Sequence, residues 1–296
     1  MNDVQKMTDI VAKFVSLVGK KLPDDIEAKL RELQVAENVP IAKTLYDSMF
    51  YNLEKAEELS RPMCQDTGVI QFFVKVGTKF PLIDKLSEIL RQAVIDSTVA
   101  APLRHNAVET FDEFNTKKNV GKAVPLVNVE LLPGCDYIEI EPYMAGGGCT
   151  LPGAAKVLMP SEGYEGLLQF VFDVMTERGL NACPPLLVGI GVATSVETAA
   201  MLSKKALLRP LGTRSDNARA AELEEVLETE FNVLGLGPQG LTGNSSVMGV
   251  HIENAARHPS TIGVAINTGC WAHRRGHIIV NADMSYEIIS HKGAIL

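Results

Sequence analysis

An uncharged stretch of the chain runs from Leu180 to Val196 and reads LNACPPLLVGIGVATSV. Its centre, Leu186–Val192, is an apolar run of strand length, and the prolines and glycines around it are typical of turns. Directly after it, Thr194 and Glu197 have the spacing of a capping box, which predicts a helix to about Leu207. A buried strand followed by a helix predicts an α/β arrangement in which a sheet and helices pack together.

Residues 1–60 carry a different, helical pattern. Apolar residues from Val4 to Val18 recur at spacings of three and four, which is the period of an amphipathic helix. Pro23 and the two aspartates after it are typical of a helix start, and a third helix is expected from about Pro40 to the end of this region. The chain is therefore predicted to begin with a helical N-terminal part.

The rest of the chain alternates between strand and helix patterns. Expected strands cover 69–76, 124–132, 137–143, 262–266, 277–282 and 286–290, and expected helices cover 81–99, 163–177 and 218–234. Loops are expected at 145–153, 235–249 and 267–270. Because no internal repeat and no clear linker is visible, residues 1–296 are predicted to form one α/β (α+β mixed) unit, in which a mixed sheet with packed helices follows the helical part.

Composition and charge narrow the classes of protein. Of 296 residues, 46% are hydrophobic and 22% are charged, which is the balance of a globular protein and excludes intrinsic disorder. The formal net charge of −8 is opposite to the basic character that binding to nucleic acid requires. The sequence shows neither a transmembrane stretch nor a signal peptide, so a cytoplasmic protein is expected.

The chain has five cysteines, and in a reducing compartment they are expected to be thiols rather than disulfides. Their thiols are therefore candidate metal ligands or reactive groups. No two of them have the C-x-x-C spacing of a zinc ribbon or a thioredoxin motif, so any shared site must be assembled by the fold. Cys64, Cys183 and Cys270 each lie where a helix or strand gives way to a loop, which is where catalytic groups concentrate. The alternative is that each is a small buried hydrophobic residue. Cys135 follows a Pro-Gly pair and has the setting of a turn residue.

Three loop thiolates suggest an iron–sulfur cluster with one open iron. A [4Fe–4S] cluster is normally held by four cysteines, so three leave one iron without a cysteine ligand. Such an iron can act as a Lewis acid on a hydroxyl group and a neighbouring carboxylate, by the logic of catalytic zinc with three protein ligands. Addition or removal of water at a 2-hydroxy acid needs this chemistry, because hydroxide is a poor leaving group.

Polar residues near these cysteines could complete such a site. Gln65 and Asp66 directly follow Cys64, so the amide could hold a substrate carboxylate and Asp66 could move protons. An Asx turn or a helix cap is the structural alternative for Asp66, since Thr-Gly follows it. Arg104 offers a bidentate clamp for a carboxylate, and the alternative is a surface arginine that caps the preceding helix.

Two glycine-rich loops are candidate anion sites. Three consecutive glycines at 146–148 let backbone N–H groups approach an anion, although such a run is more often only a turn. The segment 237–246 is either a second anion-binding loop or a mobile connection. His251 and His273 lie near two of the loops, and most single histidines are structural or at the surface.

Together these segments resemble the class I iron–sulfur hydro-lyases, a family that includes class I fumarases and L(+)-tartrate dehydratases. The motif C-Q-D-T-G at 64–68 is similar to the family's first cluster-ligand motif, A-C-P-P at 182–185 is similar to the second, and Cys270 occupies the place of the third. The stretch APLRHNAVE at 101–109 resembles the α subunits of the L(+)-tartrate dehydratases more closely. So does Cys149 after the triple glycine, where fumarases usually have serine.

The resemblance implies a fold and a set of residue roles. The fold would be that of the class I fumarase N-terminal (α) domain. Cys64, Cys183 and Cys270 would hold a [4Fe–4S] cluster with one non-cysteine-ligated iron. The substrate would be bound by Gln65, Arg104, the backbone of Gly147 and Gly148, and Cys149, while Asp66 and His251 would carry catalysis.

The resemblance also implies a partner and a reaction. Single-chain members carry a second, C-terminal domain, whereas this sequence ends at Leu296, where an α subunit would end, so a separate β subunit in an α2β2-type assembly is expected. The expected reaction is the dehydration of L(+)-tartrate to oxaloacetate by an oxygen-sensitive enzyme. A two-subunit fumarate hydratase or a related dicarboxylate hydratase is the alternative within the class. Outside it, the alternatives are a cluster-based sensor and an α/β protein whose cysteines only pack.

Overall fold

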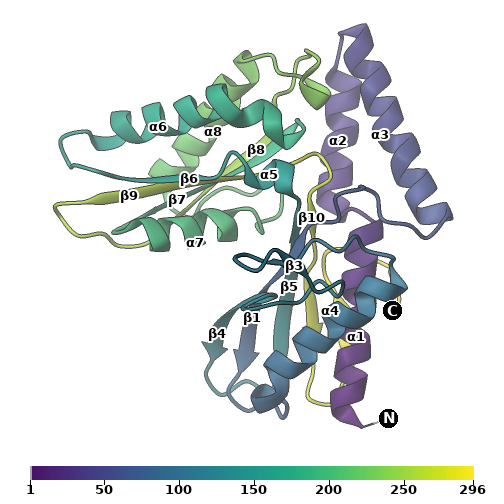
Figure 1. Cartoon of the computed structure of the whole chain (residues 1–296). Helices are drawn as coiled ribbons and strands as arrows, with labels where there is room; N and C mark the ends of the chain where they lie inside the picture. The colour runs from purple at the N-terminus through teal and green to yellow at the C-terminus, as the bar shows by residue number, and fades with distance from the viewer. Residues whose placement is uncertain (1) are drawn as a thin grey trace. The chain divides into compact units, whose positions relative to one another are not determined.

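The computed structural model describes residues 2–296 and divides into two compact units. Unit 1 consists of residues 2–24, Tyr51–Gly146 and Arg274–Leu296, and unit 2 consists of Asp25–Phe50 and Gly147–His273. Each unit has its own β-sheet with helices packed against it (Figure 1). The α/β class predicted from the sequence is therefore confirmed. That residues 1–296 act as one catalytic domain stays a prediction.

The sheet of unit 1 has the strand order β12–β11–β5–β1–β4. Its strands are β1 (Val69–Gly77), β4 (Leu126–Leu132), β5 (Ile138–Ala145), β11 (Ile278–Val280) and β12 (Tyr286–Ile288), and the short β10 (Arg274–Arg275) also pairs with β5. Strand β1 runs parallel to β4 and antiparallel to β5. A separate small hairpin joins β2 (Val108–Glu109) to β3 (Phe114–Asn115).

Helices α1 (Asp3–Lys20) and α4 (Leu86–Ala100) pack together and close the core of unit 1 against this sheet; the short 3-10 turn η1 (Ile83–Lys85) precedes α4. Along α1, Met7, Val11, Phe14 and Val18 are fully buried, and their spacing places them on one side of the helix. Burying a side chain of this kind contributes about 1.5–3 kcal/mol relative to leaving it exposed. The apolar stripe in the sequence therefore determines which side of α1 faces the core.

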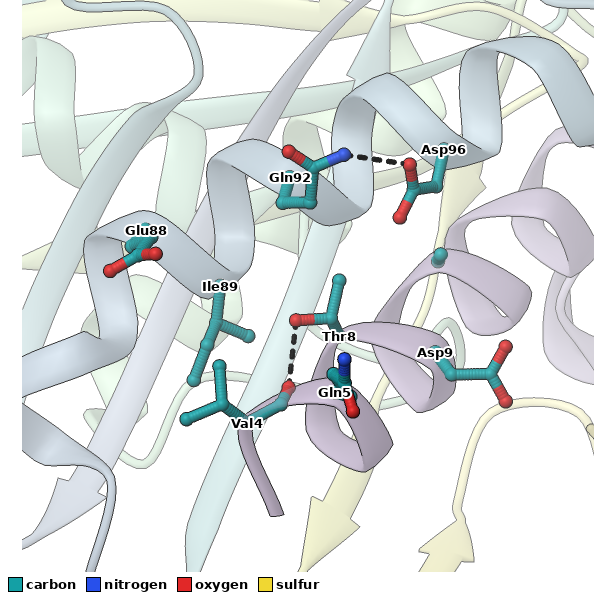
Figure 2. Close-up of a pocket in the computed structure, with 9 residues that line it drawn as sticks. Val4, Gln5, Thr8, Asp9, Glu88, Ile89, Gln92 and Asp96 are labelled. Atoms are coloured by element: carbon teal, nitrogen blue, oxygen red, sulfur yellow. Dashed lines mark hydrogen bonds between the residues drawn. The ribbon is translucent and has the colours of Figure 1, made fainter. Parts of the chain in front are cut away.

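Figure 2 shows a groove of about 300 Å³ where the first turns of α1 meet α4. Val4 and Ile89 line it together with polar side chains. Gln92 donates to Asp96 (2.8 Å) and Thr8 donates to the Val4 carbonyl (2.8 Å), and each of these two bonds lies within one helix. The groove belongs to the packing of the two helices, and none of the sequence-predicted site residues lines it.

His291 joins the C-terminal segment of unit 1 to the end of α1. The ring is fully buried, its Nε2 donates to the Lys21 carbonyl (3.1 Å), and its Nδ1 lies 2.7 Å from Ser290 Oγ. Burial lowers the pKa of His291 below its ordinary value, because the charged ring loses its hydration. The folded protein therefore keeps this ring neutral more readily than the unfolded chain does.

This burial predicts a pH dependence of stability. Because the unfolded chain binds the proton more readily, the contribution of His291 is present above its unfolded pKa of about 6.5 and is lost as pH falls through the lower folded value. The free energy of unfolding in urea should therefore fall between about pH 7.5 and pH 5, and it should fall less in His291→Gln. The control is His258→Gln, an exposed position that should keep the wild-type decline. An equal decline in wild type and His291→Gln would contradict the prediction.

The sheet of unit 2 has the strand order β6–β9–β7–β8. Its strands are β6 (Ala154–Leu158), β7 (Leu186–Ala193), β8 (Val247–Asn254) and β9 (Ile262–Gly269). Strand β7 runs parallel to β8 and antiparallel to β9. Helix α7 (Val196–Ala206) covers one face, and helices α6 (Gly163–Arg178) and α8 (Ala218–Val233) cover the other (Figure 1).

The remaining helical elements are two long helices and three single turns: α2 (Asp24–Ala36), α3 (Pro40–Glu58), α5 (Gly147–Thr150), η2 (Gly179–Ala182) and η3 (Pro238–Gly240). The helical N-terminal part predicted from the sequence is confirmed by α1, α2 and α3. Over the described residues 2–296, none of the helices is both long and apolar enough to cross a membrane.

Two glycines on β7 let α7 lie directly against the strand. A Cβ at Gly189 would come within 2.2 Å of the Ser203 carbonyl oxygen, and one at Gly191 within 1.9 Å of the Ala199 carbonyl oxygen. Only glycine allows the two backbones to approach this closely. The contact sets the position of α7, whose last turn reaches the candidate site described below.

Three details of the predicted elements are wrong. Thr194 does not cap α7: the N-cap is Ser195, and Thr194 Oγ1 donates instead to the Ala256 carbonyl (3.3 Å). The loop expected at 145–153 contains the helical turn α5, and β6 directly after it was not expected. The end of the loop expected at 235–249 is the start of β8, which pairs with β7 from Val247 on. The start of the loop expected at 267–270 is the end of β9, which pairs with β7 as far as Gly269.

Candidate functional site

The loop that contains Cys64 lies in unit 1, between α3 and β1. Its start is held by the Met63 carbonyl, which accepts a hydrogen bond from Asn52 Nδ2 (2.7 Å). Its middle is held by Arg274, a fully buried residue whose Nη1 donates to the Asp66 carbonyl (2.8 Å). The backbone on both sides of the cysteine is therefore fixed within the unit.

Asp66 lies at the centre of a hydrogen-bonded turn. Its Oδ1 accepts from Gly68 N (3.0 Å) and from Asn106 Nδ2 (3.0 Å). A Cβ at Gly146 would come within 2.7 Å of Asp66 Oδ2, so this carboxylate position requires a glycine there. The bond from Gly68 forms an Asx turn, which is the structural alternative to a role of Asp66 in proton transfer. The bond from Asn106 links the carboxylate to the segment that carries Arg104.

The Arg104 segment follows α4 and is held mainly by side chains. The Arg104 N–H donates to Thr67 Oγ1 (3.0 Å), and the Arg104 carbonyl accepts from Asn119 Nδ2 (2.9 Å). The Asn106 N–H donates to Asn119 Oδ1 (2.7 Å). Arg104 itself is exposed, as is Gln65, the neighbour of Asp66. Unit 1 thus joins an acid and an arginine segment in one hydrogen-bonded network.

Cys183 and Cys270 lie in unit 2, and a backbone bond links their segments. The Trp271 N–H donates to the Cys183 carbonyl (3.2 Å). Cys183 is exposed and has a left-handed backbone (φ 56°), a conformation that costs energy for a residue with a Cβ and concentrates at functional sites. Cys270 is buried and directly follows β9. Two of the three predicted cluster ligands therefore share one region of unit 2.

The triple glycine leads into the same region. Gly147 and Gly148 are the first residues of α5, so their N–H groups point away from the body of the helix. A Cβ at Gly148 would come within 2.9 Å of the Asn181 carbonyl oxygen, two residues before Cys183. The absence of a side chain at this glycine lets α5 approach the Cys183 loop closely.

Cys149 is tied to the strand that leads into Cys270. Its carbonyl accepts a hydrogen bond from Thr268 Oγ1 (2.9 Å), and its side chain is buried. Lys204, in the last turn of α7, lies near the Cys149 thiol. Burial lowers the pKa of Lys204, and the negative potential of Cys149 partly opposes this shift. Unit 2 therefore brings a half-buried amine to the predicted substrate loop.

Gly269 gives a test of this arrangement. A Cβ there would come within 2.1 Å of His273 Nδ1 and 2.8 Å of its Cε1, and the His273 ring is buried and bonded to the Leu207 carbonyl (2.8 Å). Gly269→Ala should therefore displace the ring or the adjacent Cys270, at a cost of about 1–3 kcal/mol in the free energy of unfolding. Urea unfolding measures this cost. Gly212→Ala, which meets no atom within 4 Å although its φ is +82°, separates backbone strain from the clash. A loss no larger in Gly269→Ala than in Gly212→Ala would contradict the prediction.

His251 and His273 both contact the C-terminal end of α7. His251 Nδ1 lies 3.1 Å from the Ala206 carbonyl oxygen and His273 Nε2 lies 2.8 Å from that of Leu207. A carbonyl only accepts hydrogen bonds, so these ring nitrogens carry protons and satisfy carbonyls at the helix end. His251 also lines a cavity of about 360 Å³ among charged side chains: Asp25, Lys29, Glu32, Arg214 and Glu228. The catalytic role expected for His251 stays a prediction.

The second glycine-rich loop, 237–246, is a held connection. The Gln239 N–H donates to the Pro184 carbonyl (2.9 Å), and the Asn244 N–H donates to Oε2 of the buried Glu37 (2.9 Å). These bonds anchor the loop at two points within unit 2. The loop is therefore held in place rather than mobile, and one of its anchors lies directly beside Cys183.

The donor set fits an iron–sulfur cluster. The five cysteines form no disulfide within residues 2–296. Nor do three or more His, Cys, Asp or Glu side chains in that part of the chain gather closely enough to bind one metal ion. Thiolates of a [4Fe–4S] cluster bind different irons, so they need not converge on one point. The chemistry of Cys64, Cys183 and Cys270 therefore matches the group that the sequence predicts.

Four residues of this region were missed from the sequence: Asn106, Asn119, Lys204 and Arg274. Each has an ordinary alternative when read alone, because a loop asparagine suggests a turn and a lysine in the last turn of a helix suggests a helix end. Only Asn106 stood beside a predicted site residue, within Arg104-His105-Asn106. The others are joined to the site by hydrogen bonds or burial that sequence spacing does not show.

Comparison with known proteins identifies the family of the chain. A family model described as fumarate hydratase (Fumerase) matches residues 8–279. The chain is 61% identical over 293 residues to L(+)-tartrate dehydratase subunit alpha of Escherichia coli K12. The aligned region covers 99% of this chain and 97% of that protein. The same identity and coverage hold for the protein of that name from Shigella boydii. A relative from Methanocaldococcus jannaschii, provisionally named as the same subunit, is 37% identical over 273 residues, with 91% of this chain and 96% of that one covered. The chain belongs to the fumarate hydratase (Fumerase) family.

Proposed function

We propose that the chain is the α subunit of a [4Fe–4S]-dependent hydro-lyase that dehydrates L(+)-tartrate to oxaloacetate together with a separate β subunit. The observation that carries the proposal is the network in unit 1, where Asp66, two residues after Cys64, is bonded to the segment of Arg104. An acid and a carboxylate clamp in one network are what dehydration of a 2-hydroxy dicarboxylic acid requires. The similarity to relatives named L(+)-tartrate dehydratase subunit alpha supports this substrate over fumarate or malate.

Cys64, Cys183 and Cys270 would hold the cluster. Their thiols match its donor chemistry, and the left-handed backbone at Cys183 supports a functional constraint at that position. When bound, the cluster would supply Lewis acidity at an iron that has no cysteine ligand, which stabilises a departing hydroxide. Such an iron would also be open to oxygen, which supports an oxygen-sensitive enzyme in a reducing, cytoplasmic setting.

The dicarboxylate substrate would be held by side chains and backbone N–H groups. Gln65 and Arg104 would bind one carboxylate, since both are exposed and Arg104 can donate two parallel N–H bonds. The N–H groups of Gly147 and Gly148, at the start of α5, would bind an oxygen of the substrate. Cys149 would line the site beside them.

Proton transfer would fall to Asp66 and His251. Asp66 Oδ1 accepts two hydrogen bonds that orient the carboxylate, and this carboxylate would hold or move a proton. In His251, Nδ1 donates to the Ala206 carbonyl, so Nε2 would be the basic nitrogen of the neutral ring. Of the two, Asp66 has the stronger support, because it is bonded to the Arg104 segment.

The test is a substrate panel on the assembled enzyme. The chain would be produced anaerobically with its β subunit, and dehydration of L(+)-tartrate would be compared with hydration of fumarate and dehydration of malate. We expect kcat/KM to be highest for L(+)-tartrate and activity to require both chains in an α2β2-type assembly. Preference for malate and fumarate would favour the two-subunit fumarate hydratase. Full activity of the chain without a partner would contradict the α-subunit proposal.

A further inference from the structure

We propose that Asn119 is a positioning residue, which fixes the backbone of Arg104 for substrate binding and, through Asn106, supports the orientation of Asp66. The inference rests on the proposed function for its substrate and adds to it a residue that does not contact the substrate. It concerns unit 1 alone, since Asp66, Arg104, Asn106 and Asn119 all belong to it.

The Asn119 side chain is hydrogen-bonded to the backbone of both neighbours of His105, which are Arg104 and Asn106. Its Nδ2 donates to the Arg104 carbonyl (2.9 Å), and its Oδ1 accepts from the Asn106 N–H (2.7 Å). One side-chain amide therefore binds both a backbone carbonyl and a backbone N–H of this segment, as a neighbouring β-strand would. Loss of the amide would therefore leave the Asn106 N–H to water or to a new partner, and would leave the Arg104 carbonyl with only the longer bond from Thr67 Oγ1 (3.4 Å) among its side-chain bonds.

The Asn119 side chain is itself held in place. It is 2% exposed, its backbone is left-handed (φ 55°), and its Nδ2 also donates to Oγ1 of the buried Thr98 (3.1 Å). Thr98 lies on α4 and donates in turn to the Val94 carbonyl (2.7 Å). A buried amide that makes three bonds from an uncommon backbone conformation is over-determined, which is typical of a positioning device.

The chain of bonds continues from Asn119 to the acid. Asn106, whose N–H binds Asn119, donates through Nδ2 to Asp66 Oδ1 (3.0 Å) and to the Gly68 carbonyl (3.2 Å). Asp66 also keeps its bond from the Gly68 N–H (3.0 Å), so its orientation depends on Asn119 only in part. The Arg104 backbone is bonded to Asn119 directly, through its carbonyl (2.9 Å), and Thr67 holds its N–H (3.0 Å). We therefore expect Asn119 to affect substrate binding more than turnover.

The first variant is Asn119→Gly. Glycine accepts the left-handed backbone without strain, so the change removes the amide and leaves the main-chain conformation allowed. In the assembled enzyme we expect KM for L(+)-tartrate to rise about tenfold or more and kcat to change less than about threefold, because a misplaced binding group loses affinity first. Glu113→Gly is the matched control: it is left-handed (φ 50°), exposed and in the same hairpin region, and it should keep wild-type KM.

A second pair of variants acts on Asn119 from a distance. Thr98→Val removes the hydroxyl that orients the amide and keeps the shape of the side chain, whereas Thr98→Ser keeps the hydroxyl. We expect KM to rise in Thr98→Val and to return close to the wild-type value in Thr98→Ser. A purely structural role of Thr98 would lower the melting temperature without separating KM from kcat, so this pair tests positioning even if Asn119→Gly folds poorly.

Hydrogen exchange distinguishes failure of this inference from failure of the proposed function. The Asn106 amide is bonded to Asn119, so in Asn119→Gly its exchange should quicken by about tenfold or more, whatever the substrate proves to be. Unchanged exchange and unchanged KM in a folded variant would overturn the inference. If the wild-type assembly dehydrates no dicarboxylate but the Asn119→Gly exchange quickens, the proposed function fails and the positioning of Arg104 by Asn119 stands.

Discussion

Replacing Cys183 by serine should remove the iron–sulfur cluster and with it nearly all hydro-lyase activity. Serine keeps the size of the side chain but is a poor iron ligand, because clusters are held by thiolates. A metal that acts as a Lewis acid contributes several kcal/mol to a transition state, and about 1.4 kcal/mol corresponds to a factor of ten in rate. We therefore expect a loss of roughly 10³-fold or more in kcat, with the same result for Cys64→Ser and Cys270→Ser.

The measurement is anaerobic reconstitution with iron and sulfide, followed by iron and sulfide counts for each variant. Cys135→Ser is the matched control: Cys135 lies in the turn before β5, and its carbonyl accepts from Lys79 N (2.9 Å), a backbone bond that serine preserves. That variant should hold as much iron as wild type. If wild type binds no iron, or if the three substitutions leave the iron count unchanged, the cluster is not held by these residues.

Asp66→Asn should reduce kcat by about 10²- to 10⁴-fold while leaving the cluster in place. General acid–base groups contribute rate factors of this size. Asparagine keeps an oxygen that can accept from Gly68 N and Asn106 Nδ2, so the turn around position 66 should survive. The variant therefore removes the capacity to hold and release a proton without removing the Asx turn. Activity and iron content would be measured on the same anaerobic preparation.

Asp283→Asn is the matched control, because Asp283 makes the same kind of turn elsewhere in unit 1. Its Oδ1 accepts from Ser285 N (2.9 Å) and Ser285 Oγ (2.6 Å), as Asp66 Oδ1 accepts from the N–H two residues later. Asp283→Asn should keep full activity. A kcat within about twofold of wild type in an iron-loaded Asp66→Asn enzyme would show that Asp66 serves only as a turn residue.

Local patterns in the sequence predicted the elements whose stability depends on local periodicity. The apolar stripe of α1 and the proline-led starts of α2 and α3 each lie within one segment, so spacing alone reveals them. The same holds for β7, a short apolar run between turn residues. The glycine-rich segment before β6 was harder, because glycine permits both a loop and the turn of α5.

Elements whose form depends on distant partners were predicted poorly. Strand β9 extends to Gly269 because Leu187 on β7 pairs with that residue, and β8 begins at Val247 beside Leu186. Thr194 has the spacing of a cap, but its hydroxyl is taken by the Ala256 carbonyl, 62 residues away. A hydrogen-bond partner that far along the chain leaves no trace in local spacing.

The candidate site divides in the same way. Motif and residue type were enough to predict its chemical groups, which are the thiols of Cys64, Cys183 and Cys270, the acid at Asp66 and the arginine at Arg104. Tertiary structure alone decided what holds them.

The Asn119 amide donates a hydrogen bond to Arg104, 15 residues earlier in the chain, and Arg274 donates one to Asp66, 208 residues earlier. The His251 ring is hydrogen-bonded to the Ala206 carbonyl at the end of α7. Such contacts form only when packing brings remote segments within about 3 Å, because a hydrogen bond acts at short range and is indifferent to separation along the chain.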